Sequence, residues 1–158
     1  MAKRESSQRK TAIILAVLVS LFFIVCLFFL FQSAELQGQD APYYLRGVES
    51  ILKTGFLPSG ILEFPPVFFY AAAFFSLFAG TVSGIKIAAA LFAALSGVGV
   101  FLLARQLLKN NEAALVSAIF FLIAPVSMRL LDGFWKTTAA LCFLPLFFYF
   151  FFRAVKNA

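Results

Sequence analysis

The sequence contains no histidine, only two cysteines and few charged residues. Charged side chains make up 13% of the 158 residues, whereas a soluble domain carries about 25%. The lack of histidine removes the usual general base and the commonest metal ligand. Cys26 and Cys142 lie within apolar runs, so we interpret them as small buried side chains that form neither a disulfide nor a metal pair. These absences exclude the common chemistries of soluble enzymes.

Apolar side chains are what the sequence has in abundance. Hydrophobic residues make up 63% of the chain, and 23 of them are phenylalanine. This composition indicates an integral membrane protein. The formal net charge is +6, but the basic residues cluster at the ends of apolar segments. That pattern sets orientation in a membrane, so we expect contact with membrane lipid and no nucleic-acid partner.

The predicted fold class is all-α, a polytopic membrane helix bundle with four spans. Residues 1–10 form a basic cytoplasmic tail, and residues 11–31 contain 21 residues without a charge. A cleaved signal peptide is the alternative, but its apolar core is about 7–15 residues long, so we favour an anchored first span. The remaining spans are predicted at residues 85–104, 113–128 and 137–152, with a short outside loop at residues 129–136. Residues 153–158 are predicted as the cytoplasmic end, either of the whole chain or of a truncated part of it.

Residues 64–80 are apolar, but the segment is only 17 residues long and contains Pro65 and Pro66. If it does not cross, eight basic and two acidic residues lie inside, and five of each lie outside; if it does cross, the basic residues divide seven to six. The positive-inside rule therefore favours a helix that dips into the outer leaflet, with both termini cytoplasmic. This topology places Asp40, Glu63 and Asp132 together outside, whereas a fifth span would separate Asp132 from Asp40.

The predicted outside loop, residues 32–84, opens with an amphipathic interfacial helix over residues 43–54. Its apolar residues recur at helical spacing, and Glu49 and Lys53 form a favourable i,i+4 pair on the polar face. Gly55 suits the end of this helix. Asp40 is predicted either to cap the helix or to serve as a functional carboxylate, and the two roles are compatible.

The order of these features resembles the GT-C glycosyltransferases, nearest to the N-terminal membrane part of the oligosaccharyltransferase catalytic subunit and its relatives. The first-loop motif of that family falls on Asp40, followed by Tyr43, Tyr44 and Arg46. Its second outside motif falls on Ser127, Arg129, Gly133, Phe134 and Trp135. The resemblance covers nearly the whole chain, and it rests on the collinearity of motifs that are individually weak.

The resemblance implies transfer of a sugar from a polyisoprenyl-phosphate-linked donor to an acceptor on the outer membrane face. Asp40 would act as acceptor base or metal ligand, and Glu63 and Asp132 would complete a site for Mg²⁺ or Mn²⁺. Residues expected to bind the lipid phosphate or substrate are Arg46, Arg129, Lys136 and Trp135. The alternatives are interfacial snorkelling for Arg129 and Lys136 and a membrane-belt position for Trp135.

The sequence departs from the family after its second outside motif. Lys136, Thr137 and Thr138 stand where the family has acidic residues. Family members are also several times longer, so we expect either further spans beyond residue 158 or a partner membrane subunit. A non-catalytic subunit or scaffold derived from the fold is therefore the alternative function. A transporter component is less favoured, because no predicted span carries a central ionisable residue.

Overall fold

The computed structural model describes residues 2–38, 40–61, 66–124 and 135–157, and in this part of the chain every regular element is helical. The order of elements is α1 (Ala2–Leu30), α2 (Ala41–Thr54), the 3₁₀ turn η1 (Ser59–Ile61), α3 (Val67–Ala79), α4 (Thr81–Leu108), α5 (Asn111–Ile123) and α7 (Trp135–Asn157). The described residues confirm the all-helical class. They also show that the predicted basic tail continues into α1 from Ala2 onward.

Three helices are long and apolar enough to cross a membrane, with candidate spans at Gln8–Leu30, Thr81–Leu108 and Thr137–Lys156. They correspond to the first, second and fourth predicted spans, although α4 extends four residues beyond the prediction at each end. The third predicted span, residues 113–128, is described only as α5, whose 13 residues are too few for a full crossing. Its last four residues lie outside the described residues.

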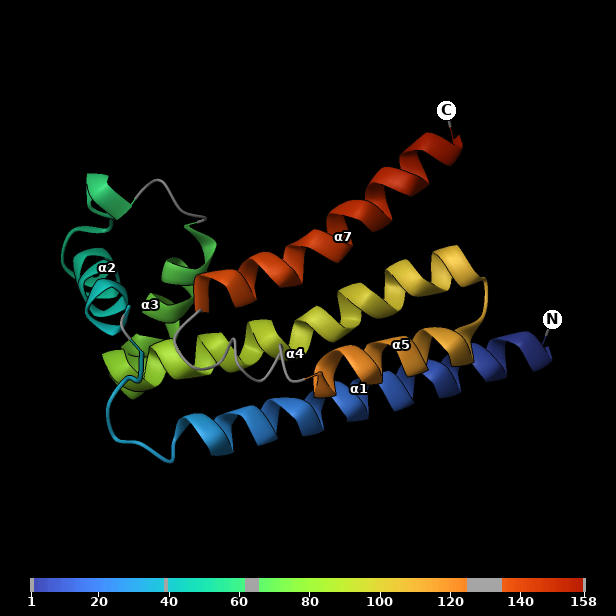
Figure 1. Ribbon diagram of the computed structural model, residues 1–158, viewed down its shortest axis with the longest axis horizontal. Coiled ribbons are helices and arrows are strands. Elements are labelled where there is room, and N and C mark those ends of the chain that lie inside the picture. The colour runs from blue at the N-terminus through green and yellow to red at the C-terminus, as the bar shows by residue number, and fades with distance from the viewer. Residues whose placement is uncertain (1, 39, 62–65, 125–134, 158) are drawn as a thin grey trace.

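Helix α4 forms the centre of the bundle and packs against α1, α3, α5 and α7 (Figure 1). In its most apolar window 56% of the residues are buried, compared with 11% for α1 and 17% for α7. Small residues explain this central position, because they let helix backbones approach closely. A Cβ added at Gly84 would lie 2.7 Å from the carbonyl oxygen of Ala72 in α3, and one added at Gly99 would lie 3.2 Å from the carbonyl oxygen of Cys142 in α7.

Helix α3 is short and folds back on the beginning of α4. Gly80 joins the two helices with a φ of 81°, a value that glycine adopts without steric cost. The 13 residues of α3 extend over about 20 Å, which is less than the roughly 30 Å of hydrocarbon in a bilayer. The described residues of α3 alone are therefore too few for a full crossing. Its packing against α4 agrees with the predicted helix that stays at one end of the bundle.

The bundle has two distinct ends (Figure 1). Helices α2 and α3 and the beginnings of α4 and α7 lie toward one end, which we call the Asp40 end. Both chain termini lie at the opposite end, with the end of α4 and the beginning of α5, and we call it the termini end. Cys26 and Cys142 are buried at 0% and 3% exposure within the bundle, which confirms their interpretation as buried side chains.

Candidate functional site

Helix α2 places Asp40 at the Asp40 end of the bundle. Asp40 occupies the N-cap position, and its backbone carbonyl accepts hydrogen bonds from the amides of Tyr43 (3.0 Å) and Tyr44 (3.1 Å). Proline in the first turn favours this start because its φ is already helical. The Asp40 side chain, however, makes no capping hydrogen bond. The carboxylate is therefore not the group that starts the helix.

Helix α2 buries one face and exposes the other, and it begins two residues earlier than the predicted start at residue 43. Tyr44 and Val48 are fully buried, whereas Arg46, Glu49 and Lys53 are exposed on the opposite face. Leu52, predicted on the apolar face, is 40% exposed. The helix ends at Gly55, which has a φ of 78° and donates its amide to the carbonyl of Ile51 at 2.8 Å. The sequence analysis predicts this helix end at Gly55.

Tyr44 joins three elements of the Asp40 end. Its ring centroid lies 4.8 Å from that of Trp135, at the beginning of α7, and 5.4 Å and 5.7 Å from those of Phe68 and Phe69 in α3. All four side chains are buried, with exposures of 1% or less. Aromatic contacts of this kind add stabilisation beyond the buried area. The first turn of α2 is thereby fixed against the first turn of α7.

This contact pairs one described residue from each of the two motifs that the family resemblance singles out, Tyr44 and Trp135. Asp40 lies one turn before Tyr44. The segment of residues 125–134, which carries Arg129 and Asp132, enters α7 at Trp135. Tyr44 and Trp135, the described residues of the two motifs, therefore meet at the Asp40 end.

A buried lysine supports the connection between α1 and α2. Lys86, in the second turn of α4, is only 3% exposed. Its ammonium group donates a hydrogen bond to the backbone carbonyl of Ser33 and lies 5.3 Å from the centroid of the Phe31 ring. The cation therefore fixes the end of α1 and the following loop onto α4. Asp40 lies seven residues after Ser33 in the same connection.

The other predicted site residues are only partly described. Glu63, Arg129 and Asp132 lie outside the described residues. Lys136 belongs to the first turn of α7, but its side chain is outside the described part. Arg46 is exposed on α2. Among the described residues, no group of three Asp, Glu, Cys or His side chains could hold a metal ion. The metal site formed by Asp40, Glu63 and Asp132 thus stays a prediction.

Two residues have structural roles that the sequence analysis did not foresee. Trp135 is 1% exposed and packs on Tyr44, so the structure places its indole in the aromatic core of the Asp40 end. Lys86 is one of the five basic residues that the charge count places outside, yet it is buried in α4 at 3% exposure. One sequence signal could have indicated its burial. Ala89, Ala90 and Ala93 follow Lys86 at i+3, i+4 and i+7, on the same helix face, and such small residues mark a face that packs against other helices.

Comparison with known proteins gives two matches. The family described as dolichyl-phosphate-mannose-protein mannosyltransferase matches residues 63–158. A protein of Archaeoglobus fulgidus, described as dolichyl-phosphooligosaccharide-protein glycotransferase 2, is 33% identical over an alignment of 105 residues, and the match covers 58% of this chain. The matched region spans only 18% of that relative's length. No solved structure matches this chain.

The family match begins at residue 63 and covers more than half of the chain, including α3, α4, α5 and α7. The match therefore includes the central helix α4 and Trp135, the partner of Tyr44. The relative from Archaeoglobus fulgidus agrees with the same assignment. The chain belongs to the dolichyl-phosphate-mannose-protein mannosyltransferase family of GT-C membrane glycosyltransferases.

Proposed function

We propose that this chain is the N-terminal membrane part of a glycosyltransferase that moves a sugar from a polyisoprenyl-phosphate-linked donor to an acceptor at the outer membrane face. The observation that carries the proposal is the contact between Tyr44 and Trp135, with 4.8 Å between ring centroids. It brings together Tyr44, which follows Asp40 in the first motif of the resemblance, and Trp135, which ends the second motif, at one end of the bundle. A transferase needs its acceptor carboxylate and its donor-binding cations in one place.

The proposed topology has four spans, with α3 at the outer face and both termini in the cytoplasm. It is supported by the shortness of α3 and by the position of both termini at one end of the bundle (Figure 1). The charge distribution of the loops orients that end toward the cytoplasm. The third span would continue α5 into the residues that follow Ile123.

Asp40 is the proposed catalytic residue, because a carboxylate at the outer interface can orient or deprotonate an acceptor. The donor already carries a phosphate leaving group, so the remaining need is stabilisation of negative charge. Mg²⁺ or Mn²⁺ held by Asp40 with Glu63 or Asp132 would supply it, helped by Arg46, Arg129 or Lys136. Trp135 is proposed to act on substrate only indirectly, through the packing of the site.

The test is Asp40→Asn in the full-length protein, assayed for transfer from a polyisoprenyl-phosphate-linked sugar. Because asparagine has the size of aspartate and is an equally good N-cap residue, the variant should keep its thermal stability and lose transfer by at least a hundredfold, the scale of a lost general base. The matched control is Glu49→Gln, which removes an exposed carboxylate from the same helix and should keep full transfer.

Two outcomes would contradict the catalytic role of Asp40. The first is unchanged transfer in Asp40→Asn. The second is a loss of transfer that matches a loss of stability.

A second candidate is a non-catalytic membrane subunit built on the same fold. It is supported by Lys136, Thr137 and Thr138, which stand where the family resemblance leads us to expect acidic residues. Thr138 is buried at 3% exposure and therefore cannot stand in for a metal ligand at the surface. If the full-length protein transfers no sugar alone but raises the transfer of a partner glycosyltransferase, this second function replaces the first.

A further inference from the structure

The termini end of the bundle contains a crevice that the proposed transferase chemistry does not use. It lies between α1, α4 and α5, has a volume of about 350 Å³, and is lined among others by Gln8, Thr11, Leu15, Val98, Arg105 and Asn111. We call it the inner crevice. A second hollow of about 650 Å³ shares Gln8, Thr11, Arg105 and Asn111 with it. The two therefore open into each other at these polar residues.

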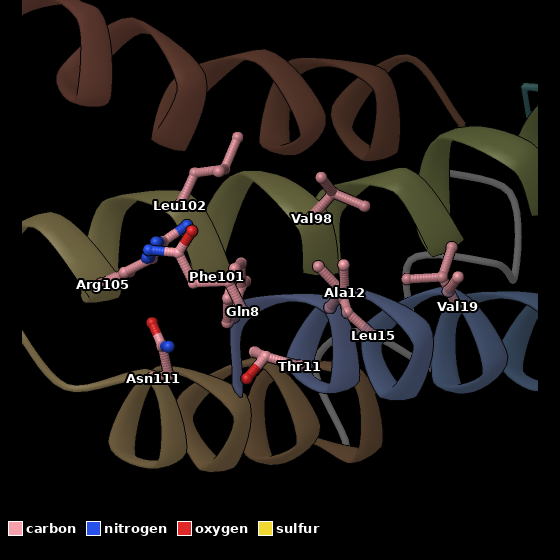
Figure 2. Close-up of a pocket in the computed structure, with 11 residues that line it drawn as sticks. Gln8, Thr11, Ala12, Leu15, Val19, Val98, Phe101, Leu102, Arg105 and Asn111 are labelled. Atoms are coloured by element: carbon pink, nitrogen blue, oxygen red, sulfur yellow. The ribbon is translucent and has the colours of Figure 1, made fainter. Parts of the chain in front are cut away.

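The inner crevice changes from polar to apolar along its length. Figure 2 shows Gln8, Thr11, Arg105 and Asn111 gathered at one end of it. Leu15, Val19 and Val98 follow toward the middle of the bundle. An apolar channel that ends in hydrogen-bond donors and a cation matches a molecule with a hydrocarbon chain and a polar, anionic head.

The charges around the polar end are mainly positive. Arg105 and Lys109 line the shared hollow together with one carboxylate, Glu112. Glu112 lies in the first turn of α5, where the helix dipole already favours a negative charge. On its other side Arg105 borders a third hollow with Arg153 and Lys156, and no acidic residue is found among the residues that line this hollow. The mouth therefore favours an anion.

We propose that the inner crevice binds an anionic glycerophospholipid, with one acyl chain against the apolar part and the phosphate against Arg105. Basic pockets between membrane helices on the cytoplasmic side favour such head groups, and an acyl chain gains stabilisation from each buried methylene. The phosphate would accept charge-assisted hydrogen bonds from the Arg105 guanidinium and neutral ones from Gln8 or Asn111. The site lies at the end of the bundle opposite Asp40 (Figure 1) and is independent of the proposed transfer reaction.

The test is native mass spectrometry of the purified, delipidated full-length protein, titrated with phosphatidylglycerol or with phosphatidylcholine of the same acyl chains. We expect phosphatidylglycerol to bind at least ten times more tightly. Arg105→Gln should abolish this preference, because one charge-assisted hydrogen bond is worth about a tenfold change in affinity. Arg105→Lys, which keeps the charge, should retain most of the preference.

Two further variants separate the crevice from general surface charge. Ala16→Phe fills the apolar part of the crevice without changing the charge, and should weaken phosphatidylglycerol binding about tenfold. Arg9→Gln removes a cation from an exposed position of α1 that does not line the crevice, and should change nothing. Because Ala16→Phe alters an exposed position on a lipid-facing helix, it keeps the test decisive even if Arg105→Gln does not fold.

Four results would overturn the proposal. Equal affinity for the two lipids would show that the head-group charge is not recognised. An equal loss in Arg9→Gln and Arg105→Gln would assign binding to diffuse charge. Displacement of the lipid by inorganic phosphate alone would show that the acyl chain contributes nothing. Binding of no lipid at all would assign the crevice to another helix of a longer chain.

Discussion

The two ends of this helix bundle are built in opposite ways. At the Asp40 end, Tyr44, Phe68, Phe69 and Trp135 form a buried aromatic cluster that joins α2, α3 and α7. At the termini end, α1, α4 and α5 leave a crevice lined by both apolar and basic side chains. Both ends contact the same central helix, α4.

The difference shows how one apolar sequence can support two kinds of surface. The proposed transferase site needs rigid positioning, because its carboxylate and its cations come from separate segments of the chain. Aromatic packing can provide that rigidity. A loosely packed end lowers the stability of a membrane protein only a little, because lipid can fill the space between the helices. We therefore expect substitutions at the Asp40 end to affect stability more than equivalent substitutions at the termini end.

Trp135→Ala should have the largest effect. It removes the indole that contacts Tyr44 and is expected to lower the free energy of unfolding by about 3–5 kcal/mol. The matched variant is Phe101→Ala at the termini end, where the ring already borders the inner crevice and a smaller loss is expected. Thermal unfolding in detergent measures both. Equal losses would refute the difference between the two ends.

Gly84→Ala tests the close contact between α3 and α4. The added Cβ would lie 2.5 Å from the backbone nitrogen of Ser76, so one helix must shift, and we expect a loss of about 1–3 kcal/mol. Gly60→Ala is the control, because nothing lies within 4 Å of the corresponding Cβ. If both variants unfold at the wild-type temperature, the tight α3–α4 packing is wrong.

Lys86→Met should have a smaller effect on global stability, about 1.5 kcal/mol, because it removes one charge-assisted hydrogen bond while keeping the aliphatic stem. Its clearer consequence should be local. The connection of residues 31–38 loses its anchor to α4 and should become more sensitive to limited proteolysis. Lys53→Met, at an exposed position of α2, should leave the proteolysis pattern unchanged. A protected connection in Lys86→Met would mean that the lysine does not hold it.

Much of this fold could be predicted from the sequence. Hydropathy locates α1, α4 and α7, because a long apolar stretch with few or no charges is typical of a membrane-spanning helix. Helical spacing and Gly55 locate α2 and its end. The charge count also predicts that α3 stays at one end, which its 13 residues support. These features depend on local composition, so the sequence alone suffices.

The remaining features depend on which helix faces pack against each other. The hydropathy of a segment does not show which of its faces meets another helix. Lys86 looks like a solvent-exposed cation at the start of a span, but the fold buries it under the α1–α2 connection. Trp135 looks like a membrane-belt residue, but the fold packs it on Tyr44, 91 positions earlier in the chain. Of the three predicted metal ligands the structure describes only Asp40, since Glu63 and Asp132 lie outside the described residues, so the site itself stays a prediction.

The most direct test of the account is the accessibility of single cysteines to a membrane-impermeant maleimide, in the full-length protein with Cys26 and Cys142 replaced by alanine. The central claim is that the Asp40 loop and the segment before α7 lie on the same, outer side of the membrane. The account predicts that Asp40→Cys and Asp132→Cys are labelled from outside, whereas Glu112→Cys is labelled only after permeabilisation. Labelling of Asp40→Cys with protection of Asp132→Cys would contradict the shared site and the four-span topology together.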